Sequence, residues 1–302
     1  MTARPLANVA ASVHRRLLNW VAEHNADPNQ TFHRYVLERF LYRLSQSIHA
    51  DAFMLKGAML FAIWEDEPHR PTRDIDLLGL GEDSAQRLRE IFAEVCDAGV
   101  PDDGVVFDPR SVTVGDVRGG QSFGGKRVLI DCRLGDGRQR VQVDVGFGDA
   151  LARLGEPMSL PVLLDFPAPR LLAYPVEAVI AEKLHAMAEH GMVTSRMKDI
   201  YDIVALAERL DFDGVELTAA IRTTFESRGR QAREVPPPIT PAFAADAGAV
   251  ERWGAFMRRN RLGSLDLGTA VEQARAFLLE PLAATREGES FVKRWSKGGP
   301  WR

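Results

Sequence analysis

Two aspartates, Asp74 and Asp76, stand two residues apart among apolar neighbours in the run Arg70-Pro-Thr-Arg-Asp-Ile-Asp-Leu77. In an extended strand, side chains at i and i+2 point to the same face, so both carboxylates are expected to project together, roughly 6–7 Å apart. Paired magnesium ions, about 3.5–4 Å from each other, suit such an arrangement. The spacing predicts a metal-binding strand, although a solvated strand face also carries this pattern.

The preceding segment has the pattern of a phosphate-binding turn. Phe53-Met54-Leu55 predicts a short strand, Lys56-Gly57 a turn, and the apolar run Ala58 to Trp64 a helix. A glycine turn between a strand and a helix N-terminus presents backbone N–H groups to a phosphate. Strand, glycine turn, helix and Asp-x-Asp strand follow one another in the order that a nucleotidyltransferase requires.

Asp144 is a candidate third carboxylate. In Val141 to Phe147 the apolar residues alternate, so Asp144 lies on the other face with Gln142 and Gly146. A strand antiparallel to the Asp-x-Asp strand would bring Asp144 to the same metal ions. An ordinary exposed strand aspartate is the alternative.

Two charged residues interrupt the apolar faces of predicted helices. Lys183 falls inside the apolar arc of a helix over 175–190, and Asp199 inside that of a helix over 196–210. Buried charges are usually paired or functional, and a triphosphate is one partner that a lysine can meet. The alternatives are a lysine stem that snorkels to solvent and a carboxylate that complements the helix dipole.

The other polar residues of these helices give weaker indications of function. Lys198 and Asp202, four residues apart, fit an ordinary surface ion pair. His185 is expected on the polar, solvated side of its helix. The histidines do not have the spacing of a zinc site.

Composition limits the class of protein. The 302 residues are 45% apolar and 26% charged, as in a globular chain of one or two domains. The net charge is −4, but residues 218–302 hold 14 Lys and Arg against 9 Asp and Glu, which suits a polyanion or a solvated basic surface. Two cysteines, no membrane-length apolar stretch and no secretion core predict a cytoplasmic location without membrane contact.

Periodicity predicts the elements that hold these residues. We expect amphipathic helices over 7–24 and 31–49, a helix over 85–97 capped by Ser84, and a β-rich stretch over 105–148 with a hairpin turn at Gly135-Asp136-Gly137. The proline-rich run Val235 to Pro241 predicts a rigid extended linker. The last 60 residues predict helices whose core contains Trp253, Phe256, Phe277 and Leu278.

The chain resembles the toxin nucleotidyltransferases of the AbiE abortive-infection systems, including the mycobacterial MenT-type toxins. Four blocks carry the likeness: Leu55-Lys-Gly with Arg70 to Asp76, Gln142 to Asp149, Tyr174 to Met187, and Ser195 to Asp202. Similar segments at Thr224 to Gly229 and Trp253 to Phe256 extend it over most of the chain. The family commonly has a second Gly and a Ser or Thr after Lys-Gly, where this chain has Ala58 and Met59, so a hydroxyl contact to the nucleotide is missing.

The resemblance implies an α+β fold with a nucleotidyltransferase-type mixed β-sheet core flanked by helices. The core with N-terminal helices would span residues 1–165, and a mainly helical C-terminal part, residues 166–302, would contribute Lys183 and Asp199 to the site. The implied activity moves an NMP from an NTP to an RNA hydroxyl, such as a tRNA 3′ end, with Mg²⁺ as cofactor. A separately encoded antitoxin is the implied protein partner.

In this interpretation Asp74, Asp76 and Asp144 hold metal, and Asp144 alternatively takes the hydroxyl proton. Lys183 holds the triphosphate and Asp199 orients it. Nucleotide binding is also assigned to residues in the same blocks: Lys56, Gly57, Arg70, Thr72, Lys198 and Asp202. RNA binding is assigned to three arginines of the basic part: Arg258, Arg259 and Arg261.

Two other functions remain open. One is nucleotidyl transfer to a small molecule, against which the basic C-terminal part argues. The other is a binding protein with the same fold and no catalysis, which the missing hydroxyl at residues 58 and 59 favours and the Asp-x-Asp pair opposes.

Overall fold

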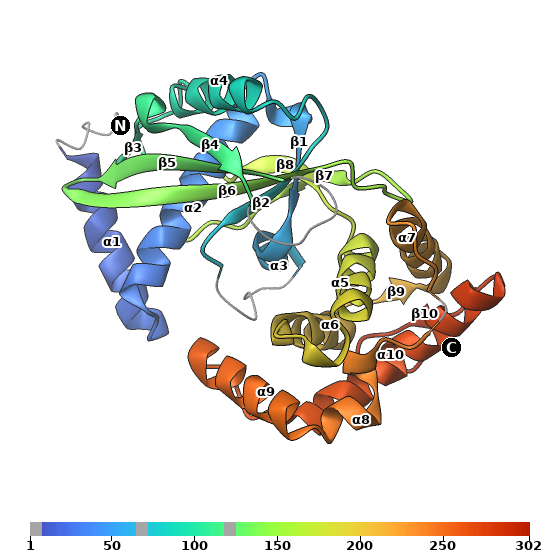
Figure 1. Ribbon diagram of the computed structural model, residues 1–302. Helices are drawn as coiled ribbons and strands as arrows, with labels where there is room; N and C mark the ends of the chain where they lie inside the picture. Colours follow the sequence, from blue (N-terminus) through green and yellow to red (C-terminus); the bar gives the residue numbers. More distant parts are fainter. Residues whose placement is uncertain (1–7, 65–71, 118–124, 233) are drawn as a thin grey trace. The chain divides into compact units, whose positions relative to one another are not determined.

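The computed structural model describes residues 8–64, 72–117, 125–232 and 234–302. The chain divides into two compact units, each with its own core (Figure 1). Unit 1 is Met1–Gly148 with Gly155–Ala173, and unit 2 is Asp149–Leu154 with Tyr174–Arg302.

Unit 1 is built on a mixed sheet of eight strands within the described residues. Their order is β3 (Val105–Phe107), β5 (Lys126–Leu134), β6 (Gly137–Phe147), β2 (Ile75–Gly79), β1 (Phe53–Lys56), β8 (Arg170–Ala173) and β7 (Glu156–Ser159), with β4 (Thr113–Asp116) paired to β5. β6 runs parallel to β2 and β8 parallel to β1, and the remaining pairs are antiparallel. The predicted α+β class, a mixed sheet flanked by helices, is confirmed.

Alternation of apolar residues explains which face of this sheet is covered. Val143 on β6 lies beside Ile75 on β2 and Val128 on β5, and all three are fully buried. Helices α2 (Pro28–Gln46) and α4 (Ala85–Cys96) pack together through Phe40 and Phe92, whose ring centroids are 6.0 Å apart. The other face carries most of the polar side chains of the same strands, including Asp76, Gln142 and Asp144, together with the buried Leu78.

The helices of unit 1 begin where their capping residues predict. α1 (Val9–His24) and α4 confirm two predicted helices, and the Ser84 hydroxyl accepts the Arg87 N–H as expected. α2 begins earlier than predicted, because the Asp27 carboxylate accepts the Gln30 N–H and Pro28 suits the first helical position.

The short connections of unit 1 are mostly 3₁₀ turns. They are η1 (Ala50–Ala52), η2 (Gly57–Leu60) and η3 (Pro109–Ser111). The apolar run after the glycine turn is therefore a 3₁₀ turn followed by helix α3 (Phe61–Trp64), rather than one helix from its start. The predicted hairpin is confirmed, with Leu134 of β5 opposite Gly137 of β6.

Unit 2 is mainly helical. Its elements are α5 (Val176–His190), η4 (Gly191–Val193), α6 (Met197–Arg209), α7 (Gly214–Ser227), η5 (Pro237–Ile239), α8 (Pro241–Ala244), α9 (Ala247–Asn260), α10 (Leu267–Glu287), and the pair β9 (Phe212–Asp213) with β10 (Arg294–Trp295). The two helices predicted around Lys183 and Asp199 are confirmed as α5 and α6. In the parts of the chain that the structure describes, no helix combines the length and hydrophobicity needed to cross a membrane.

Two predictions for unit 2 are wrong. The proline-rich run is not an extended linker, because Pro237–Ile239 form η5, Ile239 is fully buried, and the Thr240 hydroxyl caps α8. Phe256 is only partly buried, since it lies at the edge of the core beside Tyr201. Trp253, Phe277 and Leu278 are buried as predicted.

Candidate active site

The register of the sheet brings the carboxylates of unit 1 together. Asp76 on β2 is the direct neighbour of Asp144 on β6, and Lys56 on β1 lies opposite Asp76 on its other side. Asp74 lies in a bend one residue before β2, and its charge acts on Arg127 together with those of Asp76 and Asp144. The predicted adjacency of Asp144 is therefore found, but the predicted antiparallel direction is wrong, because β6 runs parallel to β2.

Gly57 is required at the turn for two reasons. Its φ of +71° lies in the left-handed region, where a Cβ is unfavourable. A Cβ at this position would also overlap the Asp76 carboxylate. The backbone of the turn thus lies directly against a candidate metal ligand.

Asp74 is held by its neighbours. The Thr72 hydroxyl donates to the Asp74 carboxylate at 3.0 Å. The preceding carbonyl, of Arg73, lies 2.8 Å from Nε2 of His33 on α2. A hydroxyl and a helix-borne imidazole therefore orient the start of the Asp-x-Asp segment.

Arg127 on β5 forms an ion pair with Asp144. Its Nε and Nη2 donate to the two carboxylate oxygens at 2.8 and 2.7 Å, a bidentate pair. This hydrogen bonding, together with the charges of Asp144, Asp74 and Asp76, raises the Arg127 pKa. The arginine therefore neutralises part of the negative charge on this face. Arg127 is a functional residue that its local sequence does not mark, although the predicted hairpin turn places residues 127 and 144 opposite each other.

The carboxylates fit magnesium, which prefers oxygen ligands and is usually held by one or two carboxylates together with substrate phosphates. Asp74 and Asp76 supply such a pair. Among the described residues, no group of three Asp, Glu, His or Cys side chains is placed to hold a metal ion. The candidate ligand set is thus the Asp74–Asp76 pair, with Asp144 engaged by Arg127.

Unit 2 contains a buried ion cluster on α5 and α6. The Lys183 ammonium lies 2.6 Å from Asp202 and 3.2 Å from Asp199, and the Arg196 Nε lies 2.6 Å from Asp199. Both aspartates are completely buried. Lys183 and Asp199 interrupt the apolar faces of α5 and α6 as predicted, and the structure pairs them with each other.

Two expectations for the same helices are wrong. Asp202 is not part of a surface pair, because the tight contact between α5 and α6 buries it beside Lys183. His185 is not solvated, because α7 covers it: its ring packs edge-on against Phe225 at 5.1 Å, and Arg228 approaches Nδ1. Burial lowers the His185 pKa. Arg196, which the sequence analysis also missed, stands one turn before Asp199.

The remaining predicted site residues lie in different parts of the chain. Lys198 is exposed on α6, and Arg258, Arg259 and Arg261 are exposed at the end of α9. Arg70 lies outside the described residues. The assignments of Lys183, Asp199, Lys198 and Asp202 to the same site as the unit 1 carboxylates stay predictions.

Comparison with known proteins identifies the family of this chain. The sequence profile described as nucleotidyl transferase AbiEii toxin, type IV TA system, matches residues 39–278. The chain belongs to this family. AbiEii membership confirms the resemblance and makes the chain a nucleotidyltransferase-type toxin of a type IV toxin–antitoxin system, with an antitoxin as its expected partner.

Solved structures show weaker likenesses. JHP933 from Helicobacter pylori aligns with a TM-score of 0.49 and 12% identity over 87% of this chain and 94% of its own. A second H. pylori protein, provisionally named a nucleotidyltransferase, aligns with a TM-score of 0.44 and 14% identity over 94% and 97%. No curated protein sequence matches the chain.

Proposed function

We propose that this AbiEii-family chain moves a nucleotidyl group from an NTP to an RNA hydroxyl, with a tRNA 3′ end as the acceptor and the cytoplasm as its location. The observation that supports the proposal is Asp76 beside Asp144 on neighbouring strands, with Asp74 two residues earlier and the Gly57 turn packed against the Asp76 carboxylate. In a nucleotidyltransferase family, such a carboxylate pair is the expected metal ligand set.

In the proposed mechanism, each residue has a defined task. Asp74 and Asp76 would hold Mg²⁺, with the Thr72 hydroxyl keeping Asp74 oriented. Bound Mg²⁺ supplies positive charge that stabilises the charge developing on the triphosphate. The acceptor hydroxyl attacks the α-phosphorus, the bond to pyrophosphate breaks, and Asp144 accepts the hydroxyl proton or serves as a further metal ligand.

The direct test is transfer of label from α-labelled NTPs to total tRNA in Mg²⁺. We expect label on the 3′ ends of tRNA and none on tRNA whose terminal ribose has been oxidised with periodate. Label on a small metabolite would instead favour the small-molecule transferase. Absence of transfer with every NTP would favour a binding protein.

The acceptor assignment has its own test at the end of α9. Arg258, Arg259 and Arg261 are exposed, and phosphate contacts release counterions, so tRNA affinity should fall as salt rises. Reversing all three to Glu should weaken tRNA binding and reduce the salt slope by roughly one for each phosphate that is no longer neutralised. Filter binding across a salt series measures both quantities.

A matched control separates a local contact from a change in net charge. Arg286, Arg294 and Arg302 are also exposed in unit 2, so reversing them makes the same change in charge elsewhere. Equal decreases in tRNA affinity for both triple variants would refute the assignment of the α9 arginines.

A further inference from the structure

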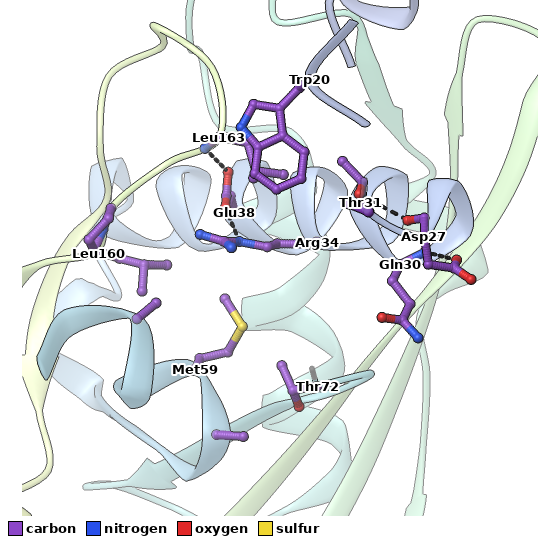
Figure 2. A pocket seen from close by; sticks show the side chains of 14 residues that line it. Trp20, Asp27, Gln30, Thr31, Arg34, Glu38, Met59, Thr72, Leu160 and Leu163 are labelled. Carbon is purple, nitrogen blue, oxygen red and sulfur yellow. Dashed lines mark hydrogen bonds and ion pairs between the residues drawn. The ribbon is translucent and has the colours of Figure 1, made fainter. Parts of the chain in front are cut away.

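Unit 1 contains a cavity of about 220 Å³ beside the glycine turn (Figure 2). Its walls come from α1, α2, η2, α3 and the loop after β7, and its lining includes Trp20, Gln30, Arg34, Glu38, Met59 and Thr72. Thr72 is the residue whose hydroxyl donates to Asp74. The cavity therefore adjoins the candidate metal ligands through one hydrogen-bonded side chain.

The polar side of the cavity is preorganised on α2. Glu38 is completely buried, and its carboxylate accepts hydrogen bonds from Arg34 Nε at 2.8 Å and from the Leu163 N–H at 3.0 Å. Burial raises the Glu38 pKa. Arg34 extends across the space in Figure 2, with Gln30 one turn earlier on the same helix. A buried carboxyl and a guanidinium thus form a fixed hydrogen-bonding edge.

The remaining walls are apolar and include an aromatic ring. Met59 lies across the cavity from Arg34 in Figure 2, and Leu160 and Leu163 complete that part of the lining. Trp20 is stacked on His24, with centroids 4.1 Å apart and planes 10° from parallel, which holds the indole in place. Ala58 and Met59, the residues that depart from the usual family pattern, both line this space.

A flat ring with a hydrogen-bonding edge matches these walls. The volume is below the roughly 300–1,000 Å³ of pockets for drug-sized ligands, so a ring fits better than a whole nucleotide. Aromatic and apolar walls stack a nucleobase, and paired polar groups read its edge. We infer that the cavity binds a nucleobase, from either the incoming NTP or the acceptor RNA; this inference rests on the proposed function.

The test fills the cavity and measures binding without turnover. Ala62 on α3 lines the cavity, so Ala62→Phe would occupy it, whereas Ala22 on α1 is exposed outside the lining, so Ala22→Phe is the matched control. The probes are the four NTPs, inorganic tripolyphosphate, and a single-stranded RNA ending in CCA, all in Mg²⁺. If Ala62→Phe does not fold, Trp20→Ala replaces it, with circular dichroism and melting as the check.

We expect Ala62→Phe to weaken binding of at least one base-containing probe by about tenfold or more, the scale of a lost stacked base, and to leave tripolyphosphate binding unchanged. Loss confined to NTPs assigns the cavity to the incoming base, and loss confined to the RNA assigns it to the acceptor. Unchanged binding of every probe, or an equal loss for tripolyphosphate or in Ala22→Phe, would overturn the inference. Wild-type protein that binds bases but transfers no nucleotide would refute the proposed function and leave the cavity assignment intact.

Discussion

The two units both combine carboxylates with a cation, but in opposite environments. In unit 1 the Asp144–Arg127 pair is partly exposed, with 21% and 42% of the side chains accessible. In unit 2 the Lys183 cluster is closed, with 13% of the lysine and none of the Asp202 side chain accessible. The partly exposed pair can separate at little cost and admit another ligand. The buried cluster contributes to the integrity of α5 and α6, because an ion left alone there is expensive.

Lys183→Met tests the buried half of this comparison and has the largest expected effect. Loss of the ammonium leaves the completely buried Asp199 and Asp202 without that cation, so the free energy of unfolding should fall by about 3–5 kcal/mol. Denaturant unfolding measures this loss. Lys198→Met, an exposed lysine of α6, should change stability little. Equal stability of the two variants would show that the cluster is not structural.

Gly57→Ala tests the contact between the turn and the acidic face. The new Cβ would overlap the Asp76 carboxylate and require an unfavourable backbone at φ +71°. We expect transfer to fall by about 10²-fold or more, as when a charge-stabilising group is misplaced. Gly115→Ala, on β4 with open space around its Cβ, should retain activity. Normal transfer by Gly57→Ala would separate the turn from catalysis.

Arg127→Gln tests the partly exposed half and has the smallest expected effect on stability, within about 1 kcal/mol. Removing the guanidinium frees the Asp144 carboxylate, so titration with Mn²⁺ should show tighter binding if Asp144 is a metal ligand. Arg140, paired with Asp131 on the same hairpin, is the matched site, and Arg140→Gln should leave the affinity unchanged. Equal Mn²⁺ affinities in both variants would exclude Asp144 from the metal site.

Local patterns predicted most of the acidic face. The two-residue period predicted that Asp74 and Asp76 project together, and the hairpin turn contained the register that pairs Arg127 with Asp144. The direction of β6 relative to β2 was not predictable in this way, because it depends on the whole connection through α4 and β5. Strand neighbours far apart in sequence have no local signal.

Helical periodicity likewise predicted only part of the buried cluster in unit 2. A helical wheel identified Lys183 and Asp199, which interrupt apolar arcs, but Asp202 was expected in a surface ion pair with Lys198. Burial of Asp202 and His185 depends on which helices cover α5 and α6, and that packing is tertiary. The proline-rich run was misjudged for the same reason: contacts around Ile239 favour η5 over an extended conformation.

The most direct test of the central claim compares transfer by wild type, Asp76→Asn and Asp131→Asn. Asp76 is a candidate metal ligand, whereas Asp131 pairs with Arg140 farther along β5. We predict that Asp76→Asn reduces label transfer from NTP to tRNA by about 10²–10³-fold with unchanged melting, because charge stabilisation is lost and the fold is not. Asp131→Asn should remain close to wild type. Near-normal transfer by Asp76→Asn would contradict the assignment of the Asp-x-Asp pair as the catalytic metal site.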